Sequence, residues 1–140
     1  MRKEDKMNKI TLNTIKRQYT NNGQHAEQVF RFTLTGEIRK ADNLSHTEGG
    51  DVLDIQIKSA RATVCRGTDL KAYLDLDGAN RYAYVTSDFE NAYIMSREEY
   101  TEFVNEFGTV TRESQRNGGH AKIRLAHEGA RMKAWLEERA

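Results

Sequence analysis

Cysteine is almost absent from this chain, because Cys65 is the only one among its 140 residues. A single cysteine excludes an internal disulfide and any zinc site built from several cysteines. No stretch approaches the roughly 20 apolar residues of a membrane-spanning helix, and no apolar run follows the charged residues 1–6, so we expect no membrane span and no secretory signal. Proline is absent as well, which excludes no function class. These features favour a protein of the reducing cytoplasm in which Cys65 is a small core residue.

The chain also has no large excess of positive or negative charge, since its formal net charge is only +1. Net charge therefore gives no argument for a nucleic-acid partner. Residues 109–140 nevertheless hold seven Lys or Arg against four acids, which is compatible with a basic face or with an ordinary solvated surface. The length, with 37% hydrophobic and 31% charged residues, predicts one compact domain spanning residues 1–140.

Apolar spacing predicts the helices. Residues 26–34 carry an apolar stripe with helical period, and Gly36 stands where a C-cap glycine is expected. Residues 96–107 begin with a capping box, in which Ser96 and Glu99 cap each other's backbone, and Gly108 ends the helix. We expect a weak helix over residues 11–19 and a last helix over residues 130–138.

Alternating apolar residues predict strands over residues 37–40, 52–58, 61–65, 81–86, 92–95 and 122–125. The order of these elements predicts an α/β fold in which helices flank a small central mixed sheet. The tyrosines that alternate on two of these strands, Tyr82, Tyr84 and Tyr93, are interpreted as packing residues of the sheet.

The most informative segment is residues 49–59, where a Gly-Gly pair and Asp51 precede a short strand that ends in Gln56-Ile57-Lys58. Asp54, Gln56 and Lys58 are expected on one face of that strand, because successive side chains alternate. A lysine beside a carboxylate and an amide on a half-buried strand is a costly arrangement for packing alone. The same group suits binding of a divalent cation and activation of water at a phosphodiester.

Hard cations such as Mg²⁺ take oxygen ligands. Asp51 offers a carboxylate, Gln56 its amide oxygen or Ile57 its carbonyl, and Glu27 from the preceding helix is a candidate to complete the set. Lys58 is the candidate to stabilise negative charge and to lower the pKa of the attacking water. Alternatively, Lys58 is a strand-end lysine that reaches solvent, Asp51 caps a turn and Glu27 is an ordinary surface residue.

These residues resemble the core of the PD-(D/E)xK, or restriction-endonuclease-like, nucleases over about residues 24–65. The resemblance implies a mixed sheet flanked by helices, dependence on Mg²⁺ or Mn²⁺, and DNA as substrate. It implies that Asp51 is the first motif acid, Gln56 stands in place of the second acid, Lys58 is the motif lysine and Glu27 is the helix-borne glutamate. Gly50 replaces the motif proline, and Asp54 is a candidate to supply the acid that Gln56 lacks.

Several polar residues outside this segment are candidate DNA contacts. The loop of residues 111–120 is rich in residue types that meet phosphates and base edges, although it equally suits a flexible hairpin loop. The candidates are Ser59, Arg61, Arg112, Ser114, Arg116, Asn117, Lys122 and Arg124. Because one domain of this size holds one active site, cutting both strands of DNA implies a homodimer or a higher homo-oligomer.

The sequence therefore predicts a Mg²⁺-dependent DNA endonuclease. Two alternatives stay open. One is a nucleic-acid-binding module without catalysis, for which the neutral Gln56 is the best argument. The other is a protein–protein interaction module of the immunity or adaptor kind, which the near-neutral net charge favours.

Overall fold

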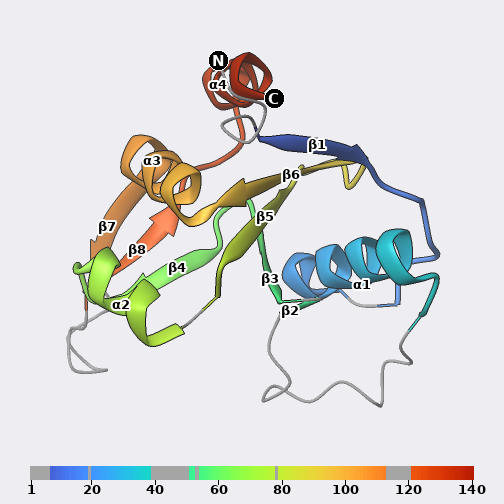
Figure 1. Cartoon of the computed structure of the whole chain (residues 1–140), viewed down its shortest axis with the longest axis horizontal. Coiled ribbons are helices and arrows are strands. Elements are labelled where there is room, and N and C mark those ends of the chain that lie inside the picture. The colour runs from blue at the N-terminus through green and yellow to red at the C-terminus, as the bar shows by residue number, and fades with distance from the viewer. Residues whose placement is uncertain (1–6, 19, 39–50, 53, 78, 113–120) are drawn as a thin grey trace.

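The computed structural model describes residues 7–18, 20–38, 51–52, 54–77, 79–112 and 121–140 (Figure 1). For residues 51, 52 and 77 this description covers the backbone alone. In chain order the elements of these residues are β1 (Asn8–Thr11), α1 (Asn22–Thr35), β2 (Asp51–Val52), β3 (Ile55–Ser59), β4 (Thr63–Arg66), α2 (Leu70–Asp77), β5 (Arg81–Val85), β6 (Asn91–Ser96), α3 (Arg97–Phe107), β7 (Gly108–Arg112), β8 (Ala121–Leu125) and α4 (Ala130–Arg139).

The strands form two sheets. A five-stranded sheet has the order β1-β6-β5-β3-β2, and a three-stranded sheet has the order β4-β8-β7. The pair β3–β5 is parallel, and the other pairs are antiparallel. The predicted α/β fold with a mixed sheet flanked by helices is thus confirmed, and the three-stranded sheet is an addition that the sequence did not predict.

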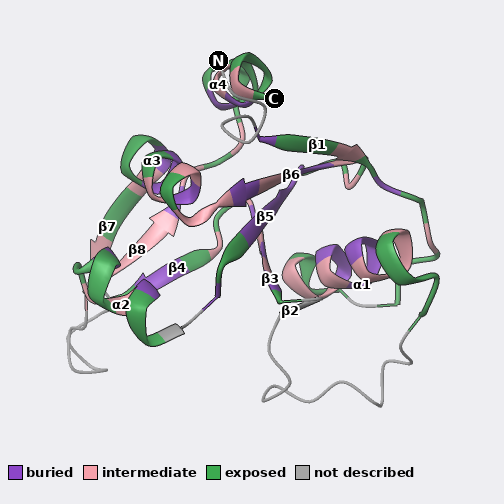
Figure 2. Ribbon diagram, in the orientation of Figure 1, coloured by how far each residue is buried: buried purple, intermediate pink, exposed green. Residues whose placement is uncertain are grey.

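Each face of the five-stranded sheet packs on its own core. Ile55 and Ile57 of β3 share one core with the buried residues Ala26, Val29 and Phe30 of α1. The other face carries tyrosines and Met95, and it shares a core with α2, α3, α4 and the three-stranded sheet. Figure 1 shows α1 apart from the other three helices, and Figure 2 shows that it contains both buried and exposed residues.

The confirmed elements are those with strong local signals. In α1 the Asn21 side chain caps Gln24 N–H, and Gly36 adopts the left-handed conformation, with φ of 74°. In α3 the predicted capping box is present, since Ser96 Oγ accepts from Glu99 N–H and the Glu99 carboxylate accepts from Ser96 N–H. Tyr82, Tyr84 and Cys65 are fully buried and Tyr93 is buried, so their prediction as packing residues is confirmed.

The predicted helix over residues 11–19 is wrong for the residues described. Thr11 ends β1, which pairs with β6, and residues 12–18 form no helix. Leu12 N–H donates to Glu90 O at 2.8 Å, and Asn13 N–H donates to Thr33 Oγ1 at 2.8 Å. These amides bond the β5–β6 turn and α1, so they are not available to a local helix.

The predicted strand over residues 52–58 is interrupted. β2 and β3 form an antiparallel hairpin around a turn, in which Asp54 has φ of 64°. Aspartate tolerates this left-handed conformation better than most residues. Asp54 therefore lies in the turn and not on the strand face, and its predicted alignment with Gln56 and Lys58 is wrong.

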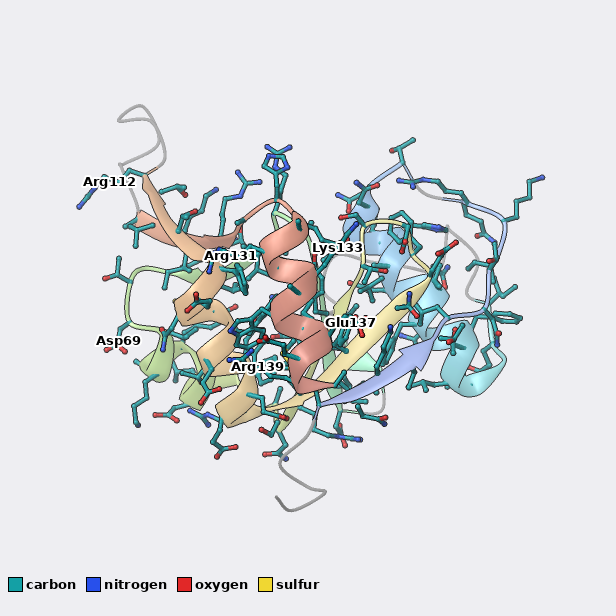
Figure 3. All side chains as sticks on the ribbon, turned by 90° about the horizontal axis from the view of Figure 1, so that it is seen from above. Asp69, Arg112, Arg131, Lys133, Glu137 and Arg139 are labelled. Atoms are coloured by element: carbon teal, nitrogen blue, oxygen red, sulfur yellow. The ribbon has the colours of Figure 1, made fainter. Side chains whose placement is uncertain are left out.

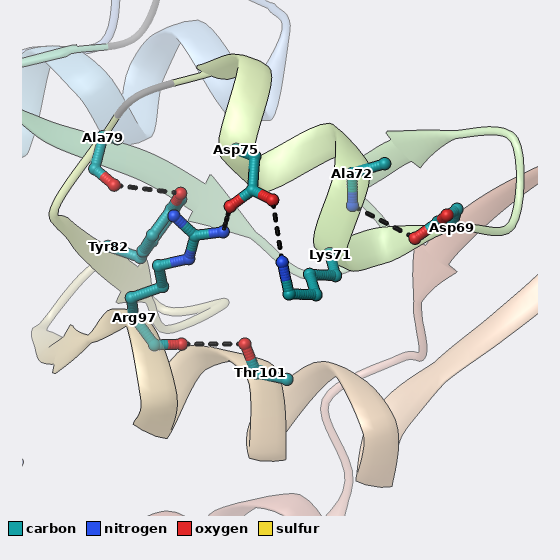
Figure 4. Close-up of polar contacts among 8 residues, drawn as sticks. All are labelled: Asp69, Lys71, Ala72, Asp75, Ala79, Tyr82, Arg97 and Thr101. Atoms are coloured by element: carbon teal, nitrogen blue, oxygen red, sulfur yellow. Dashed lines mark hydrogen bonds and ion pairs between the residues drawn. The ribbon is translucent and has the colours of Figure 1, made fainter.

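The helix α2 was not predicted, and it is attached to α3 by exposed charges. Asp75 accepts from Lys71 at 3.0 Å and forms an ion pair with Arg97, the first residue of α3 (Figure 4). Both contacts lower the pKa of the Asp75 carboxyl, the Lys71 contact more than the Arg97 contact. The predicted strand over residues 37–40 lies partly outside the described residues, and Glu37 and Ile38 belong to no strand. Among the described residues, no helix is both long and apolar enough to cross a membrane.

Candidate active site on the β2–β3 hairpin

The hairpin brings two of the predicted motif positions together. In the antiparallel register of β2 and β3, Asp51 is the direct partner of Gln56. The side chain of Asp51 is outside what the structure describes, so this statement concerns its backbone position. Direct partners in an antiparallel pair belong to the same face of the sheet. The two positions are therefore neighbours across the hairpin.

Lys58 follows on the same face of β3. Along this strand Ile55, Ile57 and Ser59 are buried, whereas Gln56 and Lys58 are half-buried. In the parallel register with β5, Gln56 and Lys58 stand beside the buried Tyr82 and Tyr84. The predicted alternation of β3 is thus confirmed for Gln56 and Lys58.

The ammonium group of Lys58 lies at the start of β4. Lys58 Nζ donates to Thr63 O at 3.2 Å, where the chain leaves the five-stranded sheet to begin the three-stranded one. The neighbouring Tyr84 hydroxyl donates to Glu128 Oε1 at 2.7 Å. Burial, and then this carboxylate, raise the pKa of Tyr84 strongly, so the tyrosine beside Lys58 is neutral at physiological pH.

Glu27 lies on the helix that covers the opposite face. It is a half-buried residue of α1, and α1 packs against the face that carries Ile55 and Ile57. Gln56 and Lys58 alternate with these two isoleucines and so belong to the other face. The N-terminal end of α1 lies beside β2 and β3 (Figure 1). A ligand shared by Glu27 and Gln56 would therefore sit at the β2 edge of the sheet.

The oxygen donors on the hairpin match the preference of Mg²⁺, which binds carboxylates, carbonyls and water. They are the Asp51 carboxylate, the Gln56 amide and the backbone carbonyl of Ile57, whose side chain is buried. In the described register, β2 pairs with Ile55 and Gln56 of β3 and not with Ile57. Within the described part of the chain no three His, Cys, Asp or Glu residues gather as a metal site. The candidate donor set thus depends on one carboxylate together with neutral oxygens.

The described DNA-contact candidates separate into two groups. Ser59 is buried at the end of β3, and Arg61 follows it in a turn with φ of 65°. Arg112, Lys122 and Arg124 belong to β7 and β8 of the three-stranded sheet. Arg124 Nε donates to Arg61 O at 3.1 Å, which joins the two groups. Ser114, Arg116 and Asn117 lie outside the described residues.

Other titratable groups take structural positions. Cys65 is fully buried, and burial, with a smaller effect of Asp69, raises the pKa of its thiol, as expected for a core residue and not for a nucleophile. His25 is buried at the start of α1 with its ring edge against Phe89. Burial, and then Arg17, lower the pKa of His25.

Sequence reasoning missed Thr63 and Arg66. Thr63 O holds the Lys58 ammonium, and Arg66 extends from β4 as an exposed cation. A backbone carbonyl carries no sequence signal, so the Thr63 contact was beyond prediction. Arg66 directly follows the predicted strand of residues 61–65, and its charge at that position was the available signal.

Comparison of the chain with protein-family models, curated proteins and solved structures gives no match.

Proposed function

We propose that this protein is a metal-dependent DNA endonuclease whose site is built on the β2–β3 hairpin. The observation that carries the proposal is the register of the hairpin, which makes Asp51 the partner of Gln56. Lys58 then follows two residues later on the same face of β3. The backbone position of Asp51 is thus next to Gln56, and Lys58 lies on the same face of β3 as Gln56.

The roles follow from the chemistry of each group. The Asp51 carboxylate and the Gln56 amide oxygen, with the Ile57 carbonyl, hold Mg²⁺ or Mn²⁺. Such an ion supplies charge neutralisation of the phosphate and a more acidic bound water. Lys58 positions the attacking water and stabilises the negative charge that develops on the phosphate oxygens. Glu27 joins the donor set if its side chain extends past the β2 edge of the sheet.

The test is nicking of supercoiled DNA and cleavage of linear DNA with Mg²⁺ or Mn²⁺, each repeated with EDTA. We expect Lys58→Met and Asp51→Asn to reduce the rate by about 10² to 10³-fold, the usual loss when one charge-stabilising group is removed. Glu27→Gln in the same assay decides whether the helix residue belongs to the site.

Two control variants test whether loss of any charged side chain, and not only loss of a site residue, lowers the cleavage rate. Lys16→Met removes an exposed lysine from the segment between β1 and α1. Asp54→Asn removes the turn carboxylate and keeps a residue that accepts φ of 64°. Both should cleave like the wild type. Nicking that persists in EDTA, or that Lys58→Met leaves unchanged, contradicts the proposal.

A second candidate is a DNA-binding module without catalysis. The neutral Gln56 favours it, because an amide replaces a charge that would hold a cation. This candidate predicts salt-sensitive DNA binding with no metal-dependent cleavage of any DNA. Calorimetric titration with Mn²⁺ separates the two candidates: heat of binding that Asp51→Asn abolishes favours the nuclease, and absence of binding favours the module.

A further inference from the structure

The three-stranded sheet presents two rows of polar side chains on one face. In the first row Arg124 of β8 stands between Thr63 of β4 and Thr109 of β7. In the second row Lys122 stands between Arg66 and Thr111. Direct cross-strand partners share a face, so these residues form one surface. We call this surface the basic face and define it by Thr63, Arg66, Thr109, Thr111, Lys122 and Arg124.

The helices lie on the other side of this sheet. Val64, Cys65 and Leu125 are buried in the core that also receives the buried residues of α2, α3 and α4. On the basic face Thr63, Arg66 and Thr109 are exposed, and the other three residues are half-buried. None of the described helices therefore covers the basic face.

The charge of this sheet has one sign. The strands β4, β7 and β8 contain Arg66, Arg112, Lys122 and Arg124 and no acidic residue. Figure 3 shows Arg112 at the far end of β7, extended away from the body of the molecule. Arg66 and Lys122 are direct cross-strand partners, and like charges in such positions destabilise a sheet. The described cations of this sheet are therefore complementary in charge to a polyanion.

The basic face adjoins the candidate active site at Thr63. Lys58 Nζ contacts the carbonyl of Thr63, the first residue of the first row. Arg124 in the same row donates to Arg61 O in the turn that connects β3 to β4. The turn is fixed by Ala62 N–H, which donates to Ser59 O at 3.1 Å, and by Leu125 N–H, which donates to Ala62 O at 2.9 Å. The ammonium group of Lys58 is therefore in contact with the first residue of the first row, Thr63.

We propose that the basic face binds the phosphate backbone of duplex DNA and directs the bound strand toward Lys58. The proposal rests on the proposed function for its choice of DNA as the polyanion. Duplex DNA carries about one charge per 1.7 Å of its axis, which suits two adjacent rows that contain the cations Arg124, Arg66 and Lys122. The contacts are made to phosphates, so this face contributes affinity and orientation and not sequence preference.

The experiment measures binding of a fluorescent DNA duplex in EDTA by anisotropy over a series of salt concentrations. Arg66→Gln combined with Lys122→Gln should weaken binding and reduce the slope of log K against log salt by about 2, or about 1 per phosphate contact. The matched control is Lys16→Gln with Lys133→Gln, two exposed lysines outside the three-stranded sheet. The control pair should leave the slope unchanged.

A second pair of variants guards against misfolding. Thr109→Glu adds a negative charge to the basic face, and Thr11→Glu adds one to an exposed threonine of the edge strand β1. We expect the first to abolish detectable binding at moderate salt and the second to bind like the wild type. Both proteins should show the wild-type melting temperature within a few degrees, which separates lost binding from lost folding.

The outcomes distinguish this proposal from the proposed function. If the wild type binds DNA through this face but never cleaves it, the nuclease proposal fails and the basic face stands. If Lys58→Met abolishes cleavage while all the face variants bind as the wild type does, the basic face is refuted and the nuclease stands. Absence of duplex binding, or equal affinity for duplex RNA, contradicts the assignment to DNA.

Discussion

Gly108 is the residue at which the helix α3 changes directly into the strand β7. A Cβ at this position would lie 2.5 Å from Val104 O and 2.9 Å from Ile123 Cγ2. The first contact is with backbone of α3, which cannot move aside as a flexible side chain does. Gly108 has φ of −84°, so the obstacle to a larger residue is space and not backbone conformation.

We predict that Gly108→Ala lowers the free energy of unfolding by about 1 to 3 kcal/mol, the usual cost of overpacking. Urea denaturation followed by circular dichroism measures this loss. Val110→Ala, at an exposed position of the same strand, should stay within about 0.5 kcal/mol of the wild type. Equal stability of Gly108→Ala and the wild type would show that α3 and β7 move apart easily.

In the candidate site, the positions of some residues could be predicted from the sequence and those of others could not. The alternation that places Gln56 and Lys58 on one face is local and was predictable, because neighbouring residues of a strand point to opposite faces. Asp54 escaped prediction because it precedes β3, whereas the sequence pattern predicts one strand over residues 52–58. The side of the sheet that the helix of Glu27 covers is set by long-range packing, which a single sequence does not reveal.

At the scale of elements, α3 is the helix whose start is best defined. Its capping box satisfies two backbone donors that a helix start would otherwise leave unbonded. We predict that Ser96→Ala destabilises the protein by about 1 kcal/mol. Thr14→Ala is the control, because Thr14 is an exposed hydroxyl residue outside the helices and strands. Thermal melting of the two variants tests this, and equal melting temperatures would contradict the role of the cap.

The elements that the sequence failed to predict are short or lack periodicity. β1 has four residues, and the edge strand β7 shows no alternation of buried and exposed residues. The helix α2 has eight residues and begins after Asp69, whose carboxylate accepts from Ala72 N–H at 3.1 Å. The strands β1 and β7 exist because partners distant in sequence bond them, and the cap of α2 is a local signal that sequence reasoning missed. The elements α1, α3, β5 and β6 carry stronger signals of caps or alternation.

At the scale of the whole molecule, two kinds of groups make stability depend on acidity. Burial lowers the pKa of His25, so the unfolded chain binds a proton more readily and stability falls as pH decreases below about 6.5. The carboxyls of Asp88 and Glu137 have a lowered pKa because Thr86 and Lys9, respectively, bond them. Their contribution is present above their ordinary pKa near 4 and is lost on further acidification.

We therefore predict a two-stage loss of stability on acidification, the first stage beginning near pH 6.5. The first stage has a slope of at most about 1.4 kcal/mol per pH unit, since one group takes up one proton. Urea midpoints measured from pH 8 to pH 3 test this. His25→Gln should flatten the first stage, and His127→Gln, at an exposed position, should not. The same slope in His25→Gln and the wild type would assign the first stage to another group.

The pairing of β1 with β6 joins Asn8 to Ile94 across most of the chain. During synthesis β1 leaves the ribosome well before its partner strand β6 is completed. Until then the hydrogen-bonding groups of β1 have no strand to pair with, and the apolar residue Ile10 lacks its packing against the core shared with α1. Because non-local pairs form late, β1 should be the last strand of the five-stranded sheet to dock. An unpaired β1 is thus a site through which the nascent chain is exposed to aggregation.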